Sequence, residues 1–250
     1  MENDPAGELR PKSAQDRILF ALDVPTEAEA YKYVNVLAPE VGGFKIGMEL
    51  FIAAGPRFVK NLTVERKLRV MLDLKLHDIP ETVERAARAA SALDVAFLSV
   101  HVQQRESMSR AAKVAAEAHV QLLGVTLLTS MTARDCDDLR FNDATCNPAM
   151  RAGYLAGFAW QAGVTGLVAS PQDVGTLRKK YPTSMLVCPG VRPAGAKPGD
   201  QKRTGTPGQA VRDGADYVVV GRPILDAENP VMAARMIAAE IATQTAARSS

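Results

Sequence analysis

A short charged run in the first third of the chain carries the strongest chemical signal. It reads VMLDLKLHD from Val70 to Asp78. If this run forms a β-strand, successive side chains point to opposite faces, so Asp73 and Lys75 share one face and the leucines share the other. Burying a carboxylate or an ammonium without a partner is costly. The spacing therefore predicts an Asp–Lys pair, which either serves chemistry at an interior site or is a structural ion pair.

The elements that must hold these residues follow from the hydrophobic pattern, in which strand-like and helix-like segments alternate. Eight β-rich runs are expected strands, at residues 18–24, 43–47, 69–75, 95–102, 121–128, 166–170, 185–191 and 217–221. Segments with apolar residues at three- and four-residue spacing are expected helices, at residues 27–37, 80–93, 106–118, 148–162, 172–181 and 230–242. Strand followed by helix, repeated over this length, is typical of a (β/α)8 TIM barrel of the α/β class. An open doubly wound sheet is the structural alternative.

A barrel also predicts where the remaining polar residues gather. Active sites of TIM barrels lie at the carboxyl ends of the strands, and phosphate often binds after strands seven and eight. Arginine offers a phosphate two parallel donors, and glycine lets its backbone approach closely. The residues that stand late in an expected strand or just after one are Asp23, Lys45, Asp73, Lys75, His101, Thr129, Arg192, Gly221 and Arg222. We therefore expect them to share one site.

Composition narrows the class of protein. Of the 250 residues, 47% are hydrophobic, which is enough for one sizeable core. The balance of 30 Lys and Arg against 28 Asp and Glu leaves a net charge of +2, so we expect no nucleic acid as a partner. No run approaches the ~18 apolar residues that span a bilayer, so we expect no membrane partner. The spacing of Cys136, Cys146 and Cys188 fits neither a disulfide scaffold nor a zinc site, which favours a cytoplasmic protein without a metal.

The chain has no linker or low-complexity block, which favours a single domain. Its first residues are polar and mixed in charge. We expect a flexible N-terminal arm at residues 1–16, a barrel catalytic domain at residues 17–245 and a loose C-terminal tail at residues 246–250.

The candidate residues lie in blocks of sequence that resemble the orotidine 5'-phosphate decarboxylase family. The blocks are ALD, FKIGMELF, LDLKLHDIPETV, VTLLTS, PGVRP, GDQKR and VVVGRPI, in the family's order, and they span most of residues 16–230. Related barrels that carry D-x-K-x-x-D, the sugar phosphate decarboxylases and synthases, lack the continuation HDIPxTV. The resemblance implies that orotidine 5'-monophosphate (OMP) is converted to UMP and CO2, the last step of de novo pyrimidine synthesis, without a metal or an organic cofactor.

The resemblance also implies catalytic roles. Lys75 would protonate C6 of a carbanion-like intermediate, and Asp73 would either oppose the substrate carboxylate or hold Lys75 in place. Lys45 and Asp78 would complete an alternating row of lysines and aspartates. Asp78 and Thr82 would reach into the site of a neighbouring subunit, which implies a homodimer.

The remaining matched residues would bind the rest of the nucleotide. The resemblance assigns Asp23 and Lys45 to the ribose hydroxyls, Thr129 to the pyrimidine ring, and Arg192, Gln201, Gly221 and Arg222 to the phosphate or the loop that covers it.

One loop departs from the family's pattern. Members usually follow the histidine of the fourth strand with small residues and two glycines, whereas this chain reads HVQQRE from His101. Because glycine permits a positive φ that other residues rarely adopt, this loop need not follow the family's backbone. We expect His101 to be a structural, hydrogen-bonded residue. Two other functions fit the same barrel: a metal-assisted sugar phosphate lyase, which a chelator would inhibit, and a catalytically silent barrel that binds UMP without turnover.

Overall fold

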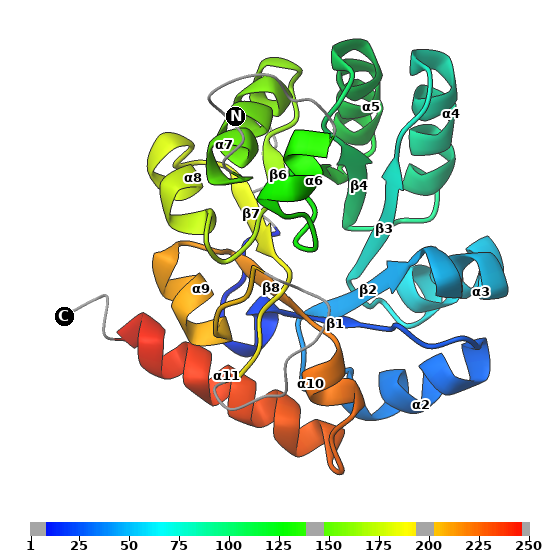
Figure 1. Cartoon of the computed structure of the whole chain (residues 1–250). Coiled ribbons are helices and arrows are strands. Elements are labelled where there is room, and N and C mark those ends of the chain that lie inside the picture. The colour runs from blue at the N-terminus through cyan, green and yellow to red at the C-terminus, as the bar shows by residue number, and fades with distance from the viewer. Residues whose placement is uncertain (1–8, 139–147, 194–202, 247–250) are drawn as a thin grey trace.

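Eight parallel strands pair with their neighbours in chain order, and β8 closes the ring against β1 (Figure 1). The computed structural model describes residues 9–138, 148–193 and 203–246. The strands are β1 (Ile18–Ala21), β2 (Gly43–Gly47), β3 (Val70–Leu76), β4 (Phe97–His101), β5 (Gln121–Val125), β6 (Gly166–Val168), β7 (Met185–Cys188) and β8 (Tyr217–Val220). The expected (β/α)8 barrel is confirmed, and the open doubly wound sheet is wrong.

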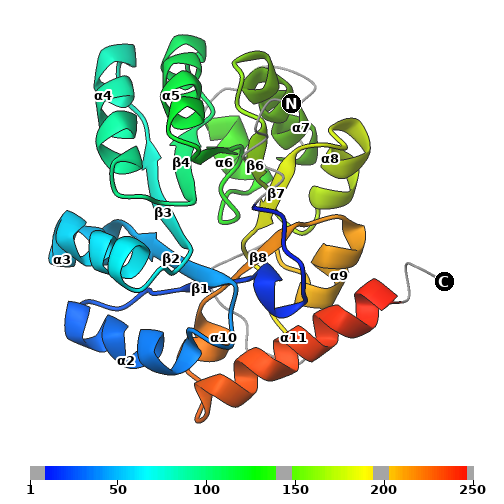
Figure 2. The same cartoon turned by 180° about the vertical axis from the view of Figure 1, so that it is seen from behind.

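Helices surround the ring on its outer side (Figures 1 and 2). They are α2 (Glu27–Leu37), α3 (Met48–Lys60), α4 (Pro80–Ser91), α5 (Arg105–Glu117), α6 (Ala133–Asp138), α7 (Pro148–Gln161), α8 (Val174–Lys180), α9 (Pro207–Asp213), α10 (Arg222–Leu225) and α11 (Pro230–Ala246), with the short turns η1 (Gln15–Arg17) and η2 (Asn61–Glu65). No helix among these is both long and apolar enough to cross a membrane.

Four of these helices, α3, α6, α9 and α10, were not expected from the sequence. The chain bends inside α3 at Gly55, whose φ is 72°, directly before Pro56, so the helical period is interrupted there. The other three have 6, 7 and 4 residues, too few to display two full turns of an amphipathic pattern. Short helices of this kind leave little periodic signal.

Alternation of side chains along each strand divides the buried residues into two cores. In β1, Leu19 belongs to the core inside the ring, whereas Ile18 and Phe20 belong to the core shared with the helices. The inner core consists of Leu19, Ala21, Met71, Phe97, Leu123, Val125, Val168, Met185, Val187, Tyr217 and Val219. Because side chains fill the interior, the barrel is not a pore, and a site must form at its mouth.

The first described residues cover the opposite, amino-terminal end of the ring (Figure 2). Tyr217 donates its hydroxyl hydrogen bond to the carbonyl of Leu9. Arg10 forms an ion pair with Asp216, with 2.5 Å between Nη1 and Oδ1, and also donates to the carbonyl of Thr183. Leu9 and Arg10, in the described part of the expected arm, therefore contact the barrel.

Candidate active site

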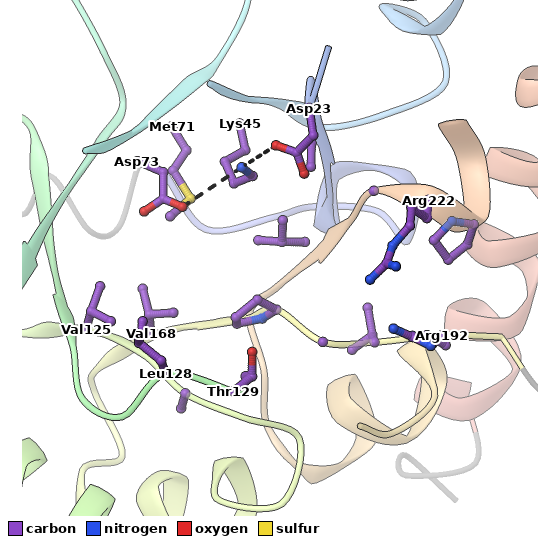
Figure 3. A pocket seen from close by; sticks show the side chains of 18 of the residues that line it. Asp23, Lys45, Met71, Asp73, Val125, Leu128, Thr129, Val168, Arg192 and Arg222 are labelled. Carbon is purple, nitrogen blue, oxygen red and sulfur yellow. Dashed lines mark hydrogen bonds and ion pairs between the residues drawn. The ribbon is translucent and has the colours of Figure 1, made fainter. Parts of the chain in front are cut away.

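A cavity of about 650 Å³ opens at the carboxyl ends of the strands (Figure 3). Its walls contain eight of the residues that the sequence assigned to a site: Asp23, Lys45, Asp73, Lys75, Thr129, Arg192, Gly221 and Arg222. They come from β2 and β3 and from the segments that follow β1, β5, β7 and β8. The volume is within the range of pockets that bind small molecules.

A row of alternating charges lies along one wall of the cavity. The ammonium group of Lys45 is 2.9 Å from Oδ1 of Asp23 and 4.0 Å from Oδ2 of Asp73 (Figure 3). The ammonium group of Lys75 is 2.8 Å from the same Oδ2 of Asp73. Asp73 therefore lies between two lysines, and the predicted Asp–Lys pair is part of a longer row.

Asp73 is ionised despite its burial. Only 8% of the residue is exposed, and burial, the largest single influence, raises the pKa of its carboxyl group. The positive charges of Lys75 and Lys45, together with hydrogen bonds from Lys75 and Ser99, outweigh burial and leave the pKa below its usual value. The site thus holds a fixed negative charge beside two ammonium groups.

Ser99 is a residue of this network that sequence reasoning missed. It lies in β4 and is fully buried. Its hydroxyl donates to Oδ1 of Asp73 at 2.8 Å and accepts from the backbone N–H of Lys75, also at 2.8 Å. The signal was available, because the period-two rule places Ser99 on the same face as Phe97, which belongs to the core inside the ring.

The backbone of β3 is irregular where Lys75 leaves it. The regular register with β4 ends at the pair Leu72 and Leu98 and resumes at Leu76 and Val100. Lys75 has a φ of 51°, a left-handed conformation that is unfavourable for an L residue other than glycine. Strand irregularities of this kind re-aim side chains near active sites.

Two arginines lie on the side of the cavity opposite Asp73 and Lys45 (Figure 3). Arg192 follows β7, and Arg222 begins α10 directly after Gly221. The backbone N–H of Arg192 donates to the carbonyl of Gly205 at 2.9 Å, so the two described ends of the segment after β7 lie side by side. The cavity therefore has an end rich in arginine and a separate wall of alternating lysine and aspartate.

A buried ion pair holds Arg203, where the described chain resumes after β7. Arg203 pairs through Nη2 with Asp173, and 7% and 4% of the two side chains are exposed. Asp173 also accepts a hydrogen bond from Ser170 at 2.8 Å. Sequence reasoning missed this pair, because thirty residues separate its members and no local spacing signals it.

The floor of the cavity is apolar. Met71, Val125, Leu128 and Val168 line it (Figure 3). Thr129 stands at its edge. A flat organic ring would bury its faces against such residues, while the charged groups would contact its substituents.

Three of the predicted site residues do not line this cavity as described. Asp78, just before α4, and Thr82, in its first turn, are both exposed. Asp78 accepts a hydrogen bond from the backbone N–H of Ile79 at 2.7 Å, and Ile79 is 64% exposed. Gln201, like Cys146, lies outside the described residues.

Comparison with known proteins places this site in a family. The family model described as "Orotidine 5'-phosphate decarboxylase / HUMPS family" matches residues 16–237. This chain belongs to that family. The orotidine 5'-phosphate decarboxylase of Anaeromyxobacter dehalogenans (strain 2CP-1) is 48% identical over 225 residues, which are 90% of this chain and 97% of that protein. The enzyme of the same name from Actinobacillus succinogenes is 44% identical over 231 residues, covering 90% of this chain and 98% of the relative.

A solved structure agrees with these sequence relatives. The crystal structure of orotidine 5'-phosphate decarboxylase from Lactobacillus acidophilus superposes with a TM-score of 0.76 at 32% identity, covering 93% of this chain and 99% of that chain. The resemblance to the orotidine 5'-phosphate decarboxylase family that the sequence blocks carried is confirmed.

The loop after β4, which departs from the family's usual sequence, adopts an ordinary backbone here. No residue from 101 to 106 has a positive φ. Gln104 precedes α5 as its N-cap residue, and Arg105 lies over the ring of Phe158 at 4.8 Å and donates to Gln161 at 3.0 Å. The glycines of the usual family pattern are therefore not required by this loop's conformation.

His101 lies beside the charged row. Burial, followed by electrostatic interactions with His77 and Lys75, lowers the pKa of its imidazole, so the ring is neutral near pH 7. Its ring centroid is 5.8 Å from that of His77. Within the described part of the chain, no three His, Cys, Asp or Glu side chains gather as a metal site.

Proposed function

We propose that this protein decarboxylates orotidine 5'-monophosphate to UMP and CO2. The observation that carries the proposal is Asp73, held between Lys45 and Lys75 on one wall of a cavity whose other end presents Arg192 and Arg222. The family and its named relatives support the same reaction. The apolar floor of the cavity suits a pyrimidine ring.

Lys75 is the proposed proton donor. When the bond between C6 and the carboxylate carbon breaks, CO2 leaves and the electron pair stays on C6. An ammonium group beside C6 stabilises this negative charge and then gives C6 a proton, which leaves a neutral amine that water reprotonates. Its 2.8 Å contact with Asp73 supports a charged, oriented ammonium. An arginine could not serve, because it does not release its proton in proteins.

Asp73 and Lys45 support this chemistry in complementary ways. The fixed negative charge of Asp73 orients Lys75 and also opposes a substrate carboxylate placed near it, and that repulsion disappears as CO2 departs. Lys45 keeps Asp73 ionised and, with Asp23, is positioned to bind the ribose hydroxyls.

The phosphate is proposed to bind at the arginine-rich end of the cavity. Arg192, Gly221 and Arg222 lie there, and Gln201 belongs to the segment that follows Arg192 in the sequence. Two guanidinium groups match a phosphate dianion in charge and in donor geometry. Thr129 is proposed to contact the pyrimidine ring from the edge of the floor.

The protein is further proposed to act as a homodimer in which Asp78 and Thr82 complete the partner's site. Support comes from their exposure and from that of the apolar Ile79, which follows Asp78 in the chain and is 64% exposed. A symmetric dimer would cover these side chains with a second copy of the same surface. The proposed location is the cytoplasm, which the free, buried thiols of Cys136 and Cys188 fit.

The metal-assisted lyase fits the site less well. A magnesium or calcium ion requires carboxylate oxygens that are available to it. In this site, the ammonium group of Lys45 already lies between Asp23 and Asp73, at 2.9 and 4.0 Å from them. This arrangement favours a reaction that needs no metal or organic cofactor.

The deciding experiment is an ultraviolet assay of orotidine 5'-monophosphate consumption by the purified protein with EDTA present. We expect turnover that survives EDTA and is lost in Lys75→Ala, while the variant remains folded and unfolds cooperatively in urea. Activity lost to EDTA would favour the lyase. A folded protein that binds UMP without turnover would favour the silent barrel.

The shared site has its own test. Mixing inactive Asp78→Ala with inactive Lys75→Ala should produce hybrid dimers that carry one intact site, which restores about a quarter of wild-type activity for random exchange of two-fold symmetric dimers. Exchange of subunits, shown by differently tagged copies, without any restored turnover would contradict a shared site.

A further inference from the structure

One buried hydroxyl contacts both members of the central ion pair. We propose that Ser99 is a positioning residue that sets the orientation of the Asp73 carboxylate and the backbone of Lys75 at the same time. This inference rests on the proposed decarboxylation, in which Lys75 and Asp73 act together. Ser99 does not line the cavity, so it acts through these two residues rather than on the substrate.

The hydrogen bonds of Ser99 assign a separate task to each oxygen of Asp73. A serine hydroxyl has one proton to donate and lone pairs with which to accept. Because the N–H of Lys75 occupies a lone pair, the single proton of Ser99 goes to Oδ1 of Asp73, at 2.8 Å. Oδ2 is then left for the ammonium groups of Lys75 and Lys45. The carboxylate cannot rotate without losing one of these contacts.

The backbone of Lys75 depends on the same hydroxyl. Between the register pairs Leu72–Leu98 and Leu76–Val100, β3 has three residues where β4 has only Ser99. A backbone N–H that lacks a strand partner needs another acceptor, and Ser99 supplies it to Lys75. The left-handed conformation of Lys75, with φ at 51°, is thus anchored at its nitrogen. Without that anchor, the strand has no reason to keep this conformation.

The surroundings of Asp73 determine how the loss of Ser99 would appear. The charged or titratable groups that face Asp73 are Lys45 from β2, Lys75 from β3 and His101 from β4. A hydrogen bond donated to the ionised carboxylate favours ionisation. Removing the Ser99 hydroxyl therefore raises the pKa of Asp73, and the effect on turnover grows as the pH falls.

The test compares Ser99→Ala with Ser184→Ala, which makes the same deletion at a buried serine whose hydroxyl has no hydrogen-bond partner. The kcat and KM for orotidine 5'-monophosphate are measured from pH 8 down to pH 5. We expect kcat of Ser99→Ala to fall by about 10- to 100-fold, the range for a hydrogen bond to a charged group, with KM within about threefold of wild type. The ratio of wild-type to variant kcat should increase toward acid pH. Ser184→Ala should match the wild type.

Three results would overturn the proposal: a Ser99→Ala kcat within about threefold of wild type, a loss of the same size in Ser184→Ala, or a loss expressed in KM alone. The carboxyl pKa of Asp73 in the free protein, read by NMR with carbon-13-labelled aspartate, provides a readout that does not depend on turnover. A higher value in Ser99→Ala supports the proposal, and an unchanged value contradicts it. Absence of turnover in the wild type would count against the proposed function and leave this second measurement to decide.

Discussion

Two buried aspartates at opposite ends of the barrel are surrounded in similar ways, but one lies between lysines and the other between arginines. Asp73 at the mouth and Asp216 at the amino-terminal end are each 8% exposed, and each lies between two cations. Asp73 contacts Lys75 and Lys45, whereas Asp216 contacts Arg10 at 2.5 Å and Arg178 at 2.7 Å. Each also accepts one neutral hydrogen bond at 2.8 Å, from the Ser99 hydroxyl and from the Leu186 N–H, respectively.

The difference lies in what the cations can still do. The guanidinium of Arg178 also donates to the carbonyls of Pro182, Ser184 and Gly214, so its donors are used within the protein. The ammonium of Lys75 lines a cavity, and 27% of its side chain is exposed there. Arginine keeps its proton, whereas lysine can release one. A carboxylate between two cations is thus a structural clamp at one end and a candidate reaction centre at the other.

Exchanging the type of cation at each end tests this contrast most strongly. Lys75→Arg keeps the positive charge but cannot give up a proton, so we expect kcat for orotidine 5'-monophosphate to fall by about 10²- to 10⁴-fold, the contribution typical of a general acid. The matched change Arg178→Lys should leave kcat within about twofold, because it acts on structure alone. Steady-state kinetics of both variants would decide the matter. Comparable activity in Lys75→Arg and wild type would remove Lys75 from its proposed role.

Neutralising each aspartate should separate stability from activity. Asp216→Asn leaves two arginines without their carboxylate, so we expect the free energy of unfolding to fall by about 2 to 4 kcal/mol while kcat is retained. This loss is smaller than that for a fully buried ion pair, because 39% of the Arg10 side chain is exposed. Asp73→Asn should abolish turnover with a smaller loss of stability, because Lys45 keeps its ion pair with Asp23. Urea unfolding at pH 7 measures the loss of stability in both variants. A larger loss in Asp73→Asn than in Asp216→Asn would contradict the comparison.

The smallest expected effect is the dependence of stability on pH. Burial, the largest influence, raises the pKa of Asp73, but the charges of Lys75 and Lys45 and the hydrogen bonds from Lys75 and Ser99 leave it below its usual value. A carboxyl with a lower pKa in the folded than in the unfolded state stabilises the fold above the unfolded value of about 3.9, and the stabilisation is lost as the pH falls through the folded value. The advantage of wild type over Asp73→Asn should therefore stay constant above about pH 5 and shrink below about pH 4. A difference that grows in acid would mean that Asp73 is protonated in the folded protein.

The sequence determined more of the barrel than of its helices. Short β-rich runs placed all eight strands, and in β1 only the end differs, at Ala21 rather than residue 24. Strands separate near the mouth, where ladder hydrogen bonds stop although the residues remain β-formers. Helix α3 was missed because Gly55 and Pro56 break its period, and α10 because it has only 4 residues. The sequence pattern thus predicted the type of each strand and longer helix, but not where each one ends.

Local spacing by itself determined that Asp73 and Lys75 share a face, because strand alternation is a property of the backbone. The sequence also contains the family's blocks in their usual order, and these blocks identified the residues that the resemblance implied. Spacing could not tell a structural ion pair from a reactive one, since both require only an acid and a base near each other.

Only the closed barrel shows that this pair faces a cavity. Ring closure brings Lys45 of β2 and Ser99 of β4 to Asp73, and brings Arg10 to Asp216 across 206 positions of sequence. Contacts between residues so far apart depend on the register and closure of all the strands, which no local pattern encodes. Whether a charged group faces a cavity or the protein's own carbonyl groups is therefore a property of the tertiary structure, and that difference separates Lys75, the proposed proton donor, from Arg178, which holds the fold together.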